Sequence, residues 1–228
     1  MTQHETTLPV SKKKIVFRAF TVREEKILLL AAESELVNDP ETTAAIIQVL
    51  TNCTLEKIDV STLATADVEW LFIQIRKRSV GEIIDGTIKC PHCQHLNQYG
   101  INLDKVEVVN TNKDKNIVID SETIVTMKYP TISSLSALDP TQNEANKTIS
   151  TVASMIEMIA VGDQVFARPD VTGQDIEAWL LNLTKTQVDK LNDFIETIPK
   201  VVYADSVKCT ACGGDVAVYM EGLEDFFI

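Results

Sequence analysis

Two pairs of cysteines are the residues of this sequence whose types and spacing most clearly indicate chemistry. Cys90 and Cys93 lie in the segment Lys-Cys-Pro-His-Cys, and Cys209 and Cys212 lie in the segment Lys-Cys-Thr-Ala-Cys. Two thiolates on one tight turn can bind the same ion, and two such turns complete the tetrahedral shell that Zn²⁺ forms with four sulfurs. The spacing therefore predicts one structural zinc site whose ligands are Cys90, Cys93, Cys209 and Cys212.

The two pairs are far apart in the chain, with 115 residues between Cys93 and Cys209. By chain-entropy estimates, closing a loop of this size costs on the order of 4 kcal/mol. Structural zinc contributes roughly 10–16 kcal/mol, which outweighs that cost. We therefore expect the helices between the two cysteine turns to be an insertion in a zinc ribbon.

Other kinds of chemistry fit these cysteines less well. A redox Cys-x-x-Cys usually stands alone at the start of a helix, but here the pair occurs twice among predicted strands. His92 or His95 could replace a cysteine as a ligand, although four sulfurs already complete the shell. A catalytic zinc keeps an open position for water, and four thiolates close it. The fifth cysteine, Cys53, follows the apolar helical stripe of Ile46 and Leu50 and is expected to be a buried, inert thiol.

Charge and composition narrow the classes of function. The chain has 228 residues, 45% of them hydrophobic, and a formal net charge of −12. This charge repels polyphosphate, so we expect no binding to nucleic acid. No apolar run is long enough to span a membrane, and the polar segment Met1–Ser11 does not resemble a signal peptide. No phosphate-binding loop or hydrolase motif occurs, so we expect no enzyme.

Hydrophobic periodicity predicts an α+β fold. Val68, Leu71, Phe72 and Ile75 have the spacing of one buried helix face, and Thr21 with Glu24 forms a capping box at a helix start. The expected strands are 14–20, several short ones in 86–108, then 117–119, 124–127 and 201–207. The first expected helix begins at this capping box, and the next two begin near residues 40 and 68. Later helices are expected over 144–160, 174–183 and 185–198.

These elements suggest a mainly helical domain inserted between the two knuckles of a four-cysteine, zinc-ribbon-like β element. Residues 1–13 are predicted to be a flexible N-terminal tail. Residues 14–228 are predicted to be a single domain, in which about 84–104 and 201–220 form the zinc ribbon.

Four segments in order along the chain resemble the baseplate hub assembly family of T-even-like tailed bacteriophages. They are Val16–Leu29 (VFRAFTVREEKILL), Trp70–Glu82 (WLFIQIRKRSVGE), Phe194–Lys200 (FIETIPK) and Glu221–Phe227 (EGLEDFF). The resemblance implies a protein of the contractile-tail baseplate, either a hub component or an assembly chaperone, with other hub or tail proteins as partners. It implies a location in the virion tail or, during assembly, in the host cytoplasm. It brings no catalytic residues.

Two further hypotheses remain open at this stage. The alternative function is a nucleic-acid-binding zinc ribbon, which a gel shift at low salt would reveal as tight, salt-sensitive binding. The second hypothesis concerns the end of the chain, where Leu223, Phe226, Phe227 and Ile228 place large apolar side chains after Gly222. We expect this segment either to dock onto a partner or to fold onto its own core.

Overall fold

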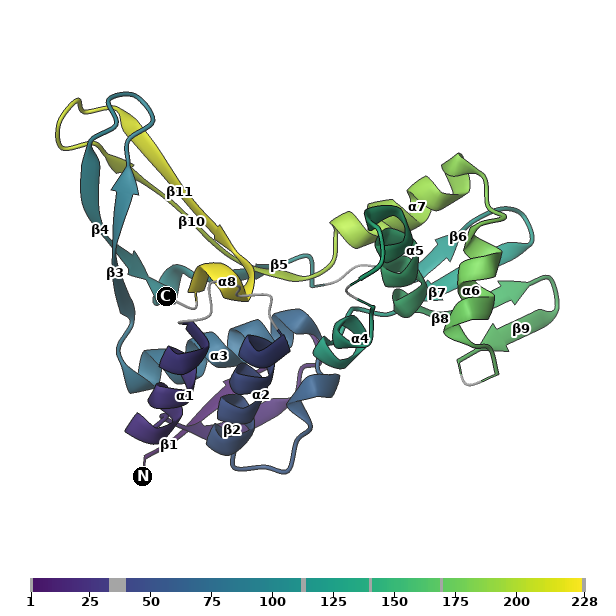
Figure 1. Cartoon of the computed structure of the whole chain (residues 1–228), viewed down its shortest axis with the longest axis horizontal. Coiled ribbons are helices and arrows are strands. Elements are labelled where there is room, and N and C mark those ends of the chain that lie inside the picture. Colours follow the sequence, from purple (N-terminus) through teal and green to yellow (C-terminus); the bar gives the residue numbers. More distant parts are fainter. Residues whose placement is uncertain (1, 33–39, 112–113, 140, 169, 227–228) are drawn as a thin grey trace. The chain divides into compact units, whose positions relative to one another are not determined.

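The computed structural model describes residues 2–32, 40–111, 114–139, 141–168 and 170–226, and the chain folds into two compact units. Unit 1 comprises residues 1–109 and 200–228, and unit 2 comprises residues 110–199. Both units combine helices with antiparallel strands, so the predicted α+β class is confirmed (Figure 1). The chain divides at residues 109 and 200, whereas the sequence led us to expect a single domain over 14–228.

The first part of unit 1 packs helices beside a two-stranded sheet. Its core comes from the predicted stripe of α3, since Val68, Leu71, Phe72 and Ile75 are all buried. One half of the predicted capping box is present, with the Thr21 backbone N–H donating to the Glu24 carboxylate at 2.7 Å, while the Thr21 hydroxyl donates to the same carboxylate. The elements are β1 (Gln3–Thr7), β2 (Lys14–Arg18), α1 (Val22–Ala32), α2 (Pro40–Cys53), the 3₁₀ turn η1 (Val60–Thr62) and α3 (Thr65–Ser79).

The start of the chain is an ordered strand, which corrects the predicted flexible tail over 1–13. Strand β1 pairs with β2 along its whole length, from Gln3 opposite Arg18 to Thr7 opposite Lys14. Leu8 is fully buried, and the carboxylate of the buried Asp67 accepts hydrogen bonds from the backbone N–H groups of Val10 and Ser11. The polar composition of β1 hid this pairing, because a strand at a sheet edge can expose most of its side chains.

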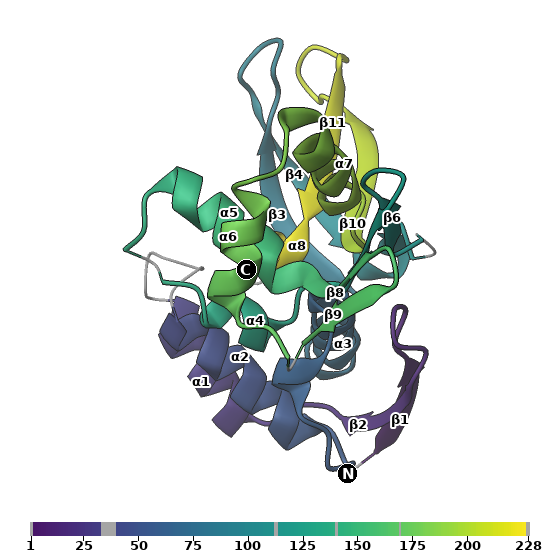
Figure 2. The same ribbon diagram turned by 90° about the vertical axis from the view of Figure 1, so that its right-hand side faces the viewer.

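Two long β-hairpins form the rest of unit 1. Strands β3 (Ile83–Lys89) and β4 (Leu96–Asn102) make the first hairpin, and β10 (Lys200–Lys208) and β11 (Asp215–Glu221) make the second. The 3₁₀ turn η2 (Leu103–Lys105) leads into β5 (Glu107–Val109), which pairs with the other edge of β10. A last short helix, α8 (Gly222–Phe226), follows β11. In both views, the loops at the ends of the two hairpins lie next to each other (Figures 1 and 2).

Unit 2 is an antiparallel four-stranded sheet with helices. Its strand order is β6-β7-β8-β9. Helices α5 and α6 contact each other, and α5 also packs against α7 and β8. The elements are β6 (Asn116–Val118), β7 (Thr123–Met127), α4 (Ile132–Ser136), α5 (Glu144–Met155), β8 (Ile156–Val161), β9 (Gln164–Ala167), α6 (Gly173–Leu180) and α7 (Lys185–Glu196). The segment between the cysteine pairs is therefore of mixed structure, not mainly helical as predicted.

The predicted helix over 144–160 ends early. Helix α5 stops at Met155, and the following residues form the central strand β8, which pairs with β7 and β9. Ile156 and Ile159 are buried, as the helical stripe required, but they are buried in a sheet. Their spacing fits both structures, and the β-branched residues of this segment favour a strand once two neighbouring strands can pair with it.

Candidate metal centre

The loops of the two hairpins of unit 1 have the same backbone conformation. In the first loop, the backbone N–H of Cys90 donates to the His95 carbonyl and that of Gln94 donates to the Cys90 carbonyl. In the second loop, Cys209 and Gly213 make the equivalent bonds, to Gly214 and Cys209 respectively. The residue after the second cysteine has a positive φ in both, +64° at Gln94 and +72° at Gly213. Each loop thus turns two thiols toward the same side.

The four predicted ligand sulfurs come together in one cluster. They all lie within 4.8 Å of one another, with 3.8 Å between Cys90 and Cys212 and 3.6 Å between Cys93 and Cys209. A tetrahedral zinc shell with bonds of about 2.3 Å places its sulfurs about 3.8 Å apart. A disulfide would require about 2.05 Å. The donor set and its spacing therefore fit a metal ion of the zinc type.

The pKa values of two of the four thiols are shifted in opposite directions. Backbone N–H groups of Cys212 and Ala211 donate to the Cys209 sulfur and lower its pKa to about 6. At Cys93, a backbone N–H bond from His95 lowers the pKa, but desolvation and hydrogen bonds with the other three thiols outweigh it and raise the pKa to about 12. Four thiolates at this distance repel one another, and a bound dication would offset that repulsion.

Asn97 connects the two loops, and sequence reasoning missed it. This buried side chain accepts hydrogen bonds from the backbone N–H and the hydroxyl of Thr210, both at 2.9 Å. Its amide group donates to the Cys209 sulfur at 3.6 Å. An alignment of the two cysteine loops in the sequence could have identified this residue. In that alignment the polar Asn97 occupies the position of the apolar Val216, which is buried in the second hairpin. Such partners orient the ligands of a metal site and tune their basicity.

The stems of the hairpins are joined by a polar cluster. The Tyr99 hydroxyl donates to the Asp205 carboxylate at 2.7 Å and hydrogen-bonds the Tyr203 hydroxyl, and the Lys105 ammonium donates to the same carboxylate at 2.7 Å. These bonds, first that of Lys105, hold the pKa of Asp205 well below its usual range. The cluster links β4 to β10, so it helps to hold the two cysteine loops at a fixed separation.

The other candidate side chains lie outside this cluster. Among the described residues, the metal-binding group contains the four cysteines and no histidine. His92 packs against Gly214, where an added Cβ would lie 2.7 Å from the ring. Cys53 is buried beside Arg18, and desolvation raises its pKa to about 11, which is consistent with the inert thiol predicted from the sequence.

The hypothesis that the last residues dock onto a partner is not supported at Phe226. This side chain is fully buried, and its helix α8 packs against α3, β10 and β11 of the same unit. Leu223 is half-buried, and Phe227 and Ile228 lie outside the described residues. The burial of Phe226 instead favours the alternative, in which the segment folds onto its own core.

The fold and the site define a mixed α+β protein with a four-cysteine cluster capable of binding a metal. Among the described residues, no helix has the length and apolar character needed to cross a membrane. The whole chain, residues 1–228, matches the family model described as T4 bacteriophage base plate protein. The chain therefore belongs to this family of phage baseplate structural proteins, which are part of the virion tail. No curated protein and no solved structure matches it.

Proposed function

We propose that this chain is a hub component or an assembly chaperone of the contractile-tail baseplate, that it binds other hub or tail proteins, and that it has no catalytic activity. The family match supports the baseplate role, and the four-cysteine cluster supports a structural, non-catalytic one. The four thiols fill the coordination shell that zinc prefers, so no position is left for a substrate or a water nucleophile. The surrounding residues are structural, since Asn97 and Asp205 serve to join the two hairpins.

The proposed metal is structural Zn²⁺, held by Cys90, Cys93, Cys209 and Cys212. Residues 84–104 and 201–220 would together form a zinc ribbon interrupted by unit 2. When bound, the ion would supply folding free energy by linking two hairpins that are far apart in sequence. The compactness of unit 2 supports this interrupted arrangement, because residues 110–199 make most of their contacts with one another.

Native mass spectrometry of the purified full chain tests the zinc site. We expect one zinc per chain, and we expect Cys93→Ser and Cys212→Ser each to lose it and to lower the melting temperature. The double variant should be about as unstable as either single one, because each change opens the same shell. Cys53→Ser is the control and should keep the metal. A well-folded, metal-free protein after mild chelation would contradict the proposal.

The choice between component and chaperone requires a separate experiment. Mass spectrometry of finished tails, compared with assembly precursors from infected cells, reveals when the chain is present. A component is found in finished tails, whereas a chaperone is found in precursors alone. Pull-down of the phage's own hub proteins by the tagged chain tests the proposed partners, and failure to bind any of them would contradict the partner proposal.

A further inference from the structure

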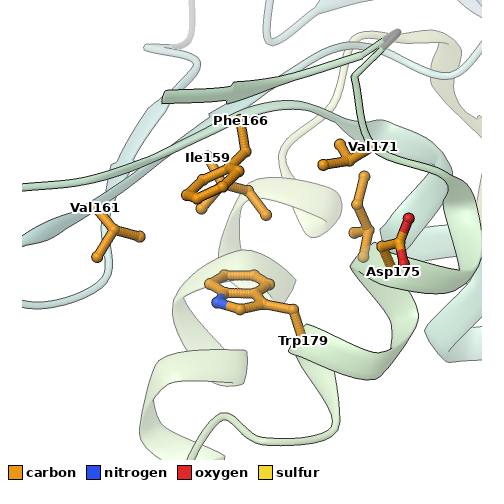
Figure 3. Close-up of a pocket in the computed structure, with 7 residues that line it drawn as sticks. Ile159, Val161, Phe166, Val171, Asp175 and Trp179 are labelled. Atoms are coloured by element: carbon orange, nitrogen blue, oxygen red, sulfur yellow. The ribbon is translucent and has the colours of Figure 1, made fainter. Parts of the chain in front are cut away.

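An apolar groove of about 260 Å³ lies within unit 2, between helix α6 and the strands β8 and β9. Figure 3 shows Phe166 and Ile159 on one side of the groove and the Trp179 ring facing them from α6. Six of the seven residues that line the groove are apolar, and the seventh, Asp175, is charged. The lining includes Ile159, Val161, Phe166, Val171, Asp175 and Trp179. A groove of this kind accepts an apolar side chain from outside the unit.

The groove adjoins an open edge of the sheet. Strand β9 is the last in the order β6-β7-β8-β9, and among the residues that the structure describes no strand pairs with its second side. Gly162 and Asp163 form a two-residue turn, so Gln164 pairs with Val161 and Phe166 with Ile159 through bonds to β8. The alternate residues Val165 and Ala167 therefore direct their backbone N–H groups away from β8, toward the open edge.

Strand β9 is short, at four residues, but it lacks the other features that usually protect an edge strand from pairing. Its sequence, Gln-Val-Phe-Ala, contains no charged residue and no proline, and its pairing with β8 has no bulge. Val165 is 58% exposed and Phe166 is 40% exposed, on opposite faces of the strand. An unprotected edge beside an apolar groove is the arrangement by which proteins bind an extended segment as an added strand.

The charges around this edge indicate which kind of segment fits. Asp163 precedes β9 and Asp170 follows it, both exposed, and Asp175 lines the groove. The nearest cation in sequence, Arg168, is held by hydrogen bonds to the backbone carbonyls of Ala153 and Ile156, and its single positive charge is outnumbered by the three acids. A second copy of this chain would bring acids against acids. The charges therefore favour a basic partner.

We propose that a short extended segment of another baseplate protein, apolar with flanking lysine or arginine residues, adds to β9 as a further strand. One apolar side chain of that segment enters the groove beside Phe166 and Trp179. Its basic residues lie next to Asp163 and Asp170. This inference rests on the proposed function, because it names the surface by which the chain binds a tail protein.

The test uses the full, metal-loaded chain and the recombinant baseplate proteins of the phage that encodes it, each titrated separately. Val165→Pro removes one N–H at the open edge and leaves the β8–β9 bonds in place. We expect it to weaken binding about tenfold, comparable to the loss of one hydrogen bond. Val165→Thr keeps that N–H and the branched shape, and it should bind like the wild type. Circular dichroism and the melting temperature check that both variants fold.

Charge reversal tests the nature of the partner. The double variant with Asp163→Lys and Asp170→Lys should bind the partner protein about tenfold more weakly than the wild type at low salt, and the difference should be smaller at high salt. The matched control reverses Asp193 and Glu196 on α7, which changes the net charge equally but lies outside the groove lining. Hydrogen exchange should show that the amides of Val165 and Ala167 become protected when the partner binds.

The outcomes separate this inference from the proposed function. If a baseplate protein binds the wild type and Val165→Pro equally well, strand addition at β9 is wrong and the proposed function stands. If none of the baseplate proteins binds the wild type, the proposed partners and this inference both fail. If light scattering shows a dimer that Val165→Pro dissociates, the occupant is a second copy and the inference is overturned.

Discussion

At the scale of single residues, the two cysteine loops share an unusual backbone conformation at one position, which is occupied by a different residue in each loop. The position after the second cysteine has a positive φ in each loop, and it is occupied by Gln94 in one and Gly213 in the other. A side chain in this left-handed region costs roughly 1–2 kcal/mol, whereas glycine adopts it without penalty. A Cβ at Gly213 would meet no atom within 4 Å, so the backbone alone decides the effect of a substitution there.

These loops provide a matched pair of substitutions. We expect Gly213→Ala to lower the free energy of unfolding of the metal-loaded chain by about 1 kcal/mol. Gln94→Gly should raise it by at most about 1 kcal/mol, because the strain that it relieves exceeds the added entropy of the unfolded chain. Urea denaturation of both variants beside the wild type measures the two changes. Effects of the same sign would show that the loops differ in conformation.

At the scale of elements, helix α3 holds the start of β10 and the start of α8 through one carboxylate. Glu69 accepts hydrogen bonds from the backbone N–H groups of Val201 and Leu223. Burial raises its pKa to about 7, although those hydrogen bonds oppose the shift. The acid is therefore more easily protonated in the folded chain than in the unfolded chain, where its pKa is about 4.5.

This shift predicts a pH dependence of stability with a definite sign. Between about pH 4.5 and 7 the folded state binds more protons at Glu69 than the unfolded state does, so this contribution to stability falls as the pH rises. The total loss is at most about 3 kcal/mol. Glu69→Gln keeps an acceptor oxygen but has no charge, so we expect it to exceed the wild type in stability at pH 8 and to match it near pH 4.5. Denaturation curves at several pH values measure this difference, and parallel curves for the two proteins would contradict it.

At the scale of the whole chain, the cysteine cluster belongs to unit 1, and unit 2 has its own sheet and core. Removal of a bound metal should therefore act on the two units unequally. The two hairpins lose the ion that links their loops, whereas the strands β6 to β9 retain all their pairings.

Hydrogen exchange before and after chelation measures this difference. We expect the protection of amides in β3, β4, β10 and β11 to fall about tenfold or more, and we expect the amides of β7 and β8 to change little. Re-addition of Zn²⁺ is the control and should restore the protection. An equal loss in both units would mean that the metal stabilises the chain as one cooperative body.

Short-range patterns in the sequence were sufficient to predict the cysteine cluster and a buried helix face. The cysteine spacing predicted which four sulfurs meet, since a Cys-x-x-Cys turn brings its own two thiols together and two such turns are needed to complete one shell. The stripe of Leu71, Phe72 and Ile75 predicted a buried helix face, which the structure bears out. These features depend on residues a few positions apart, so local periodicity and turn geometry suffice to identify them.

Contacts between residues that are distant in sequence decided the structure of β8, the turn after β1 and the role of Asn97. Only the tertiary structure contains these contacts. Ile156 and Ile159 have a spacing that suits a helix, but the pairing of β8 with two strands makes the segment a strand. The polar strand β1 pairs with β2, and Asp67, far along the chain, binds the turn between them. Asn97 became part of the site only when folding brought it to Thr210. In each case a deciding partner is remote in sequence, β7 in the case of β8, and the local pattern carries no information about it.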